Sequence, residues 1–246
     1  MKVYKSHIFA LAATHAASLL AVPAVLRAAE PTTKLEEIVV TARQREERIE
    51  DVPMSIAAFT ETEITNAGIR RPEYFVGLTS GVSVVHSAEV GDMQVNIRGI
   101  NTGRDAETNF ALVVDGVLQT NSMALNRELA GVTQIEVLKG PQGAVYGRNA
   151  VAGAVIITTR QPGEEFGGEI RAGYGTDNTY NGSLYFGGPL ASGVRGSLQA
   201  YTTHTDGQYK NVLLGCDDCV DYFEESGAEG RLMFELASGE MDFKAK

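Results

Sequence analysis

The chain has 246 residues, of which 43% are hydrophobic, and it contains 27 glycines but lacks tryptophan. Its formal net charge is −10, and its 21 Lys and Arg residues are scattered along the sequence. Phosphate backbones are bound by concentrated basic surfaces, so this composition argues against a nucleic-acid partner. The length allows one large domain or two ordinary ones.

The first residues have the layout of an export signal. Lys2 and Lys5 precede a largely apolar run over residues 8–25, and alanine-rich sequence follows it. A positive segment, an apolar segment and a zone of small residues make up a secretory signal peptide. The run is short and interrupted by polar residues, which disfavours a membrane-spanning helix. We therefore expect a signal peptide over residues 1–29, with an N-terminal membrane anchor as the alternative.

Residues 30–51 read as a charged leader that contains one strand-prone segment. Ile38 to Thr41 is β-branched throughout, and a charged stretch follows over residues 43–51. A short strand in such a setting can add to the sheet edge of another protein. It can equally be the first strand of the domain that follows, and both interpretations stay open.

The next stretch carries two helix signals. Thr60 and Glu63 have the spacing of a capping box, which predicts a helix that Gly68 ends. Pro72 at a first helical position predicts a second helix that runs toward Leu78.

Strand signals follow the helices. Residues 93–98 alternate apolar and polar side chains, which predicts a half-buried strand. Asp115-Gly116 between Phe110–Val114 and the run that begins at Val117 predicts a hairpin, because this pair supplies the positive φ angles of a type I′ turn. Further strands are expected at Ile135–Leu138 and Val155–Thr159. Together these elements predict a compact mixed α/β domain over residues 52–162.

The stretch from Glu136 to Arg160 joins two β-branched runs through a glycine-rich linker. The glycines of this linker are Gly140, Gly143, Gly147 and Gly153. Glycine reaches backbone angles closed to other residues, so we expect tight turns and close packing here. A phosphate loop is excluded, because the ending Gly-Lys-Ser/Thr is missing and Pro141 removes one cradle N–H.

From Gly167 onward the pattern becomes strictly alternating. Ile170, Ala172 and Tyr174 alternate with polar or small residues, and three later segments repeat the pattern around Leu184, Leu198 and Leu232. Segments of about ten residues with one apolar face are typical of transmembrane β-barrel strands. We expect short turns at residues 189–193 and 237–240 and a long external loop over residues 205–227. A soluble antiparallel sheet is the alternative.

The two cysteines, Cys216 and Cys219, lie in an acidic loop. Two ligands without a nearby paired His or Cys make a poor metal site, and Asp217 and Asp218 oppose the lowered thiol pKa that redox catalysis needs. We favour a disulfide that braces the loop, and we expect no metal and no cofactor.

Four motifs occur in an order that resembles the family of TonB-dependent outer-membrane receptors. Leu35 to Ala42 resembles the TonB box, and Ile97-Arg98-Gly99 resembles a plug motif. Val114 to Val117 resembles the plug hairpin, and Glu136 to Gly147 resembles the sequence signature at the end of the plug. The resemblance covers nearly the whole chain after the signal peptide. It identifies the chain as similar to a gated uptake receptor and not to an enzyme, in agreement with two lone histidines, His86 and His204, and no Ser/His/Asp spacing.

The resemblance implies a fold and a mechanism. The fold is an α+β plug domain followed by antiparallel transmembrane β-barrel strands, here residues 163–246. Ligand binds outside, and the TonB box becomes available to TonB, the periplasmic arm of an inner-membrane energy-transducing complex. TonB then pairs with the box by strand addition. The expected location is the outer membrane of a Gram-negative cell.

Specific residues inherit roles from this resemblance. The residues of the TonB box are Glu37, Ile38, Val39, Val40, Thr41 and Ala42. The residues of the plug motifs are Gly99, Asp115, Gly116, Gly140, Gly143, Tyr146 and Gly147. Arg98 and Lys139 match the basic positions that pair with glutamates of the barrel wall, and lysine there loses the bidentate geometry of arginine.

The barrel is predicted to be incomplete. Plugged transporters close with roughly 22 strands, whereas about five fit after Gly167 at about ten residues each. We therefore expect a fragment of a receptor that takes up a siderophore-like iron chelate or another bulky nutrient. The alternative is a shortened, non-transporting plug that binds only ligand or TonB. The sequence does not identify the ligand.

Overall fold

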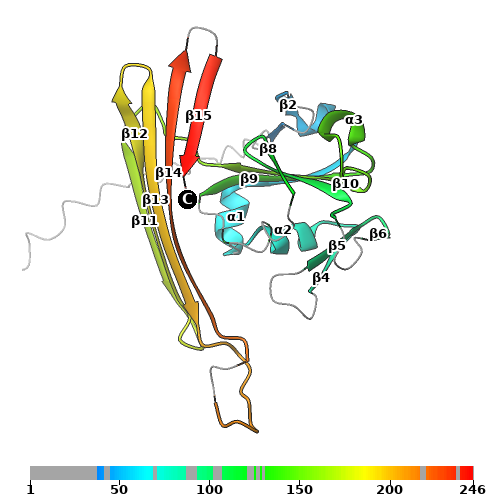
Figure 1. Ribbon diagram of the computed structural model, residues 1–246, viewed down its shortest axis with the longest axis vertical. Coiled ribbons are helices and arrows are strands. Elements are labelled where there is room, and N and C mark those ends of the chain that lie inside the picture. The colour runs from blue at the N-terminus through cyan, green and yellow to red at the C-terminus, as the bar shows by residue number, and fades with distance from the viewer. Residues whose placement is uncertain are drawn as a thin grey trace, which may run out of the picture. The chain divides into compact units, whose positions relative to one another are not determined.

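The computed structural model describes residues 38–41, 45–68, 71–86, 93–101, 107–120, 125, 128, 131–216, 220–236 and 239–245. The predicted signal peptide, together with Glu37, Ala42 and Cys219, lies outside these residues. The described elements group into a mixed α/β domain and a sheet of long strands (Figure 1). Among the described residues, no helix combines the length and the apolar character that crossing a membrane requires.

A five-stranded mixed sheet forms the centre of the α/β domain. Its strands, in spatial order, are β3 (Ser55–Thr60), β9 (Val132–Lys139), β10 (Gly153–Thr159), β7 (Phe110–Val114) and β8 (Val117–Gln119). Strand β10 runs parallel to β7, and the other pairs are antiparallel. The predicted strands after Ile135 and Val155 are therefore both present and lie side by side.

Both predicted helices form where the capping residues indicate. Helix α1 (Glu61–Ala67) begins after Thr60 with a reciprocal capping box to Glu63, and Gly68 ends it in the left-handed conformation. Helix α2 (Pro72–Leu78) has its proline in the first turn. Two short helices complete the set, the 3₁₀ helix η1 (Ile49–Asp51) and α3 (Gly143–Tyr146).

Two small sheets accompany the central sheet. Strands β4 (Val82–His86), β5 (Met93–Ile97) and β6 (Ile100–Asn101) form a three-stranded antiparallel sheet. Strand β5 buries alternate residues, as the sequence predicts. The second small sheet pairs β1 (Val39–Val40) with β2 (Glu47–Arg48).

The central sheet is covered on both faces by apolar clusters. On one face, Ile135 and Val137 of β9 pack with α1, α2 and β5. On the other face, Leu138 of β9 packs with Val40 from the leader and with Val52 directly after it. Because side chains of a strand alternate between faces, Gln134 and Glu136 lie on the second face, beside the leader.

Two tight features of the domain follow from its glycines. Asp115 and Gly116 have φ angles of 46° and 80°, as a type I′ turn requires, so the hairpin prediction is confirmed. A Cβ placed on Gly153 would lie 2.1 Å from the carbonyl oxygen of Leu138, so the expected close packing in the glycine-rich linker is also present.

The five strands after residue 166 form one open antiparallel sheet in chain order, here the long-strand sheet. They are β11 (Gly167–Tyr174), β12 (Tyr180–Ala191), β13 (Val194–Thr205), β14 (Phe223–Leu236) and β15 (Gly239–Ala245). This confirms the expected α+β domain followed by antiparallel barrel strands. Figure 1 shows these strands in yellow-green to red, and β12, β13 and β14 are the longest strands among the described residues.

All three predicted connections are too long. Gly239 and Glu240, which were expected in the last turn, belong to β15, because they pair with Leu236 and Glu235 of β14. Residues 189–191 belong to β12, where Pro189 pairs with Arg195 next to a register irregularity. Proline lacks an N–H and is tolerated in a strand at such irregular positions. Residues 223–227 were expected in the external loop but belong to β14, because they continue the register with β13 as far as Thr205.

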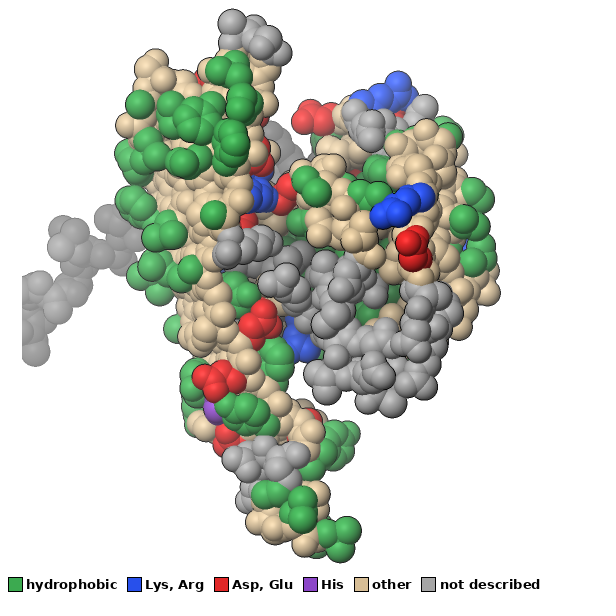
Figure 2. Space-filling model, viewed as in Figure 1, with side chains coloured by type: hydrophobic (Ala, Val, Ile, Leu, Met, Phe, Trp, Pro, Cys, Tyr) green, Lys and Arg blue, Asp and Glu red, His purple; other side chains and the backbone are tan. Residues whose placement is uncertain are grey.

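The register divides the long-strand sheet into an apolar face and a polar face. Apolar side chains on the first face include Ile170, Leu184, Phe186, Leu198, Leu232 and Phe243, and all are exposed. The polar face includes Glu169, Arg171, Arg195, Tyr201, Glu229, Arg231, Asp242 and Lys244. Figure 2 shows hydrophobic side chains gathered over this sheet at the left of the view. Such a division suits strands with lipid on one side and a polar lumen on the other.

Candidate functional site

The leading segment, Ile38–Thr41, is anchored on the α/β domain. Val40 is fully buried in the second apolar cluster, whereas Val39 is 44% exposed. The N–H of Ile49 donates to the carbonyl oxygen of Ile38 at 3.0 Å, next to the β1–β2 pairing. The segment that was expected to serve as a partner's strand is thus folded onto its own domain, in a small sheet separate from the central one.

Two side chains of β9 bind the main chain of this segment. The amide of Gln134 donates to the carbonyl oxygen of Val39 at 2.8 Å. Oε1 of Glu136 accepts the N–H of Thr41 at 2.8 Å and the hydroxyl of Thr41 at 3.0 Å. The Gln134 amide also donates to Oε1 of Glu136 at 3.2 Å, so the two side chains form one unit.

Burial dominates the electrostatics of Glu136. This side chain is 1% exposed, and burial raises the pKa of its carboxyl above the ordinary value, although the hydrogen bonds from Thr41 act in the opposite direction. Burial and the nearby charge of Glu136 raise the pKa of Tyr146 to about 12. Because of this raised pKa, Tyr146 is a neutral phenol at physiological pH. Its ring packs against the same cluster as Val40.

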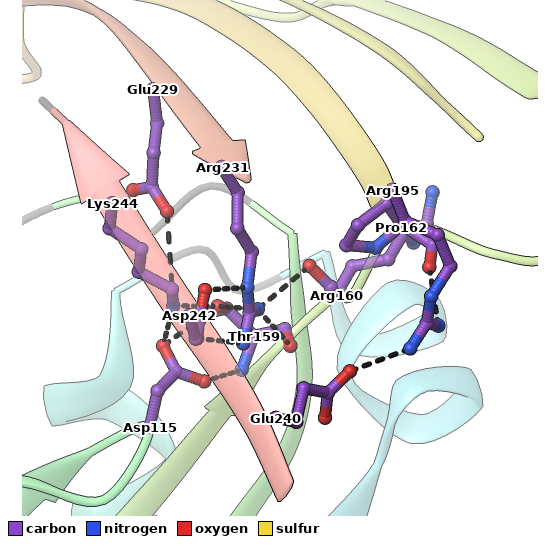
Figure 3. A network of polar contacts seen from close by, with 10 residues as sticks. All are labelled: Asp115, Thr159, Arg160, Pro162, Arg195, Glu229, Arg231, Glu240, Asp242 and Lys244. Atoms are coloured by element: carbon purple, nitrogen blue, oxygen red, sulfur yellow. Dashed lines mark hydrogen bonds and ion pairs between the residues drawn. The ribbon is translucent and has the colours of Figure 1, made fainter. Parts of the chain in front are cut away.

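A second polar site, here the polar joint, links the α/β domain to β14 and β15. It consists of Asp115, Thr159, Arg231, Asp242 and Lys244 (Figure 3). Arg231 is 4% exposed and pairs with Asp242 through two hydrogen bonds of 2.9 and 2.6 Å. Its guanidinium also donates to the main-chain oxygens of Thr159 and Arg160, at 3.3 and 3.1 Å. One arginine of the long-strand sheet thereby holds the end of β10.

Asp115 completes the polar joint from the hairpin turn. Its carboxylate accepts the N–H and the hydroxyl of Thr159, both at 2.8 Å, and forms an ion pair with Lys244. Lys244 also donates to the Thr159 hydroxyl at 2.8 Å and lies 4.0 Å from Glu229. All five side chains of the polar joint are charged or polar.

Further ion pairs lie beside the polar joint. Arg195 of β13 donates to the carbonyl oxygen of Pro162 at 3.0 Å and to Glu240 at 2.6 Å (Figure 3). Arg160 forms ion pairs with Glu61 of α1 and Glu169 of β11. The contacts between the α/β domain and the long-strand sheet are therefore carried by several cations and carboxylates.

A cavity of about 580 Å³ touches both sites. It is lined by Thr41 of the leading segment and by Asp115, Arg231 and Asp242 of the polar joint. Tyr146 lines it as well. The leading segment and the polar joint thus face one space, although they lie far apart in the sequence.

Arg98 and Lys139, which were expected to pair with barrel-wall glutamates, lie near each other. A Cβ placed on Gly140, the residue after Lys139, would lie 3.3 Å from the Arg98 guanidinium. The Lys139 ammonium donates to the carbonyl oxygen of Ser80 at 3.0 Å. Within the described residues neither side chain forms an ion pair with a carboxylate, and their pairing with a barrel wall stays a prediction.

The predicted motif residues fall into distinct structural positions. Gly99, Gly116, Gly140 and Gly147 have positive φ angles, and Gly143 opens the short helix α3. Asp115 and Tyr146 lie at the polar joint and beside the leading segment, respectively. The glycines of the motifs therefore shape turns at several places in the domain, and Asp115 and Tyr146 contribute side chains to the polar joint and beside the leading segment, respectively.

The cysteine and metal predictions concern the loop between β13 and β14. Cys216 takes part in a disulfide bond, while its predicted partner Cys219 lies outside the described residues, so the pairing stays a prediction. No cluster of three or more His, Cys, Asp or Glu side chains that could hold a metal ion occurs in the described part of the chain.

The sequence patterns did not identify the residues that form most of the hydrogen bonds and ion pairs at these two sites. Gln134 and Glu136 were not assigned to the leading segment, and Arg231 and Lys244 were not assigned to the polar joint. One signal was present for Glu136, because a carboxylate inside a strand that is buried on both faces needs a partner. Nothing in the sequence alone identified that partner as Thr41.

The chain matches one family model over part of its length, and known proteins and solved structures over most of it. A family model described as the TonB-dependent receptor plug domain matches residues 48–154. The pesticin receptor of Yersinia pestis is 27% identical over 202 residues, which cover 81% of this chain and 30% of that protein. The vitamin B12 transporter BtuB of Photobacterium profundum is 30% identical over 182 residues, covering 71% of this chain and 28% of that protein.

A solved structure agrees with these matches. The crystal structure of the ferric yersiniabactin uptake receptor FyuA from Yersinia pestis superposes with a TM-score of 0.69 at 26% identity. The match covers 78% of this chain and 30% of that one. The chain thus spans about 30% of the length of the curated relatives that it matches first.

Proposed function

Because the chain belongs to the family of TonB-dependent outer-membrane receptors, which are not enzymes, we propose that it is the plug-bearing part of an energised uptake receptor. In this proposal the α/β domain is the plug, the long-strand sheet belongs to the barrel wall, and the leading segment is the TonB box. Residues 1–29 direct export, and the receptor works in the outer membrane of a Gram-negative cell.

The polar joint is the observation that carries this proposal. A plug must stay in its barrel until it is pulled, so its contacts must be specific and also replaceable by water. The ion pair of Asp115 with Lys244 and the bonds from Arg231 to Thr159 meet both requirements. An apolar seal of the same area would favour permanent association.

The proposed cargo is a siderophore-like iron chelate or another bulky nutrient. Its support is the range of ligands in the names of the relatives, which include ferric yersiniabactin and vitamin B12. Both are too large for a narrow open pore, and both fit a gated one. Energy comes from the TonB complex, so the chain needs no nucleotide site of its own.

The proposal predicts that a backbone change in the leading segment uncouples uptake from binding. Replacing Val39→Pro removes a main-chain N–H and the freedom to pair as a strand. We expect uptake of the labelled ligand to fall to the background of a host that lacks a receptor for it, while ligand binding to isolated outer membranes is unchanged. The measurement uses cells that produce the full-length polypeptide, with a panel of ⁵⁵Fe-loaded siderophores and labelled vitamin B12.

The matched control is Val39→Ala, which keeps the N–H and leaves main-chain pairing intact. It should retain most of the uptake, because strand addition depends on main-chain hydrogen bonds. Full uptake in the proline variant would show that the leading segment is not the TonB box.

A further inference from the structure

The leading segment has two strand edges, and β2 occupies one of them. Strand β1 pairs with β2 through Val40 and Glu47, and the carbonyl oxygen of Ile38 accepts the N–H of Ile49. In an extended chain, main-chain groups two residues apart point to the same edge. Ile38 and Val40 therefore face β2, and Val39 and Thr41 face the opposite edge.

The opposite edge is occupied by side chains instead of by a strand. The Gln134 amide donates to the carbonyl oxygen of Val39, and the Glu136 carboxylate accepts the N–H of Thr41. These are the acceptor and the donor that a neighbouring strand would use. Gln134 and Glu136 are two residues apart on β9, so their spacing matches that of Val39 and Thr41.

The rest of the contact fixes the segment in place. Val40, between the two bonded residues, is fully buried against Leu138 and its neighbours. The hydroxyl of Thr41 adds a second bond to the Glu136 carboxylate at 3.0 Å. Burial of one side chain and bonding of both flanking residues hold a segment that is otherwise only a two-residue strand.

We propose that Gln134 and Glu136 act as a displaceable stand-in for a neighbouring strand, which keeps the TonB box on the plug and must release it before TonB can pair with that edge. This inference rests on the proposed function for the identity of the partner. The stand-in and the partner use the same main-chain groups, so the two bound states exclude each other. Only molecules whose TonB box is released from the plug can bind TonB, so the apparent affinity for TonB is lowered in proportion to that released fraction.

The first test measures how firmly the leading segment is held on the plug, by hydrogen exchange of the full-length polypeptide in detergent. Glu136→Ala removes the acceptor of the Thr41 N–H. A hydrogen bond to a charged group contributes enough stability that its loss should speed exchange at Thr41 by about tenfold. Glu136→Gln keeps an acceptor oxygen, so the Thr41 N–H of this variant should exchange at an intermediate rate. Glu164→Ala, which removes an exposed carboxylate, should match the parent protein.

The second test measures competition with the partner by calorimetry. The probe is the isolated periplasmic domain of TonB, titrated into the same variants. Glu136→Ala should raise its affinity by about tenfold, in proportion to the exchange rate at Thr41. Unchanged exchange in β9 and β10 shows that the plug remains folded in each variant. Gln134→Ala, which leaves the carboxylate in place, should act in the same direction with a smaller effect.

The outcomes separate the inference from the proposed function. Equal exchange at Thr41 in the parent protein and in Glu136→Ala would show that Glu136 does not hold the leading segment on the plug. Faster exchange at Thr41 with unchanged TonB affinity would show that this contact does not compete with TonB. TonB could bind neither the receptor nor a synthetic peptide of residues 36–44 while exchange at Thr41 still accelerates in Glu136→Ala. The role of Glu136 in holding the segment would then be supported, and the assignment of the segment as the TonB box would be wrong.

Discussion

The interior of the α/β domain and the polar joint are held together by opposite chemistry. The interior buries Phe110, Ile135 and Val155 with almost complete exclusion of water. The joint brings together Asp115, Arg231 and Lys244, whose partners are charges and main-chain oxygens. One region is built to stay assembled, and the other is built from contacts that water can replace one at a time.

The difference follows from what water offers to each group. Apolar side chains find no substitute in water, so separating them costs the full transfer free energy. Hydrogen-bonded groups regain bonds to water, so each bond contributes only about 1 kcal/mol net, or about 1.5–3 kcal/mol where one partner is charged. A plug that must leave a wall without unfolding needs the first chemistry inside and the second at its boundary.

The largest effect is expected from breaking the interior. Phe110→Ala removes a ring that is 1% exposed and should lower the stability of the α/β domain by about 3–5 kcal/mol. Native-state hydrogen exchange of the β9 and β10 amides measures this loss. Leu78→Ala, at a side chain that is 64% exposed, is the control and should change little. Equal effects at the two positions would contradict the assigned core.

A smaller effect is expected at the turn that carries Asp115 into the polar joint. Gly116 has a φ of 80°, so Gly116→Ala should cost about 1–2 kcal/mol through backbone strain alone, because no atom lies within 4 Å of the new Cβ. Gly143 has equal space without a positive φ, so Gly143→Ala should be neutral. Thermal unfolding of the two variants under one condition makes the comparison, and a stable Gly116→Ala protein would argue against the type I′ turn.

The sequence predicted the features whose causes are local. The capping box at Thr60, the proline at position 72 and the Asp115-Gly116 turn each depend on a few neighbouring residues, and each formed as expected. Alternation of apolar residues identified the long strands for the same reason. Strand ends were less certain, because the extent of β14 depends on pairing with β13 and not on its own residues.

The polar sites could not be predicted because their partners are distant in the sequence. Thr41 and Glu136 are separated by 95 residues, and Asp115 and Lys244 by 129. A family resemblance assigned the plug–wall contacts to Arg98 and Lys139, where the cations come from the plug. The polar joint has the reverse arrangement, with cations on the long-strand sheet and the carboxylate of Asp115 on the α/β domain.

The contrast between the two regions is tested most directly by hydrogen exchange of the full-length polypeptide in detergent at low and high salt. The Thr159 N–H reports on the polar joint because it donates to Asp115, and the amides of β9 report on the interior. Salt weakens ion pairs, though less where they are partly buried, as Asp115 and Lys244 are at 8% and 20% exposed, and it leaves apolar packing intact. We predict faster exchange at Thr159 in 1 M salt with unchanged exchange in β9. Equal acceleration at both, or none at Thr159, would contradict a separable plug boundary around a permanent core.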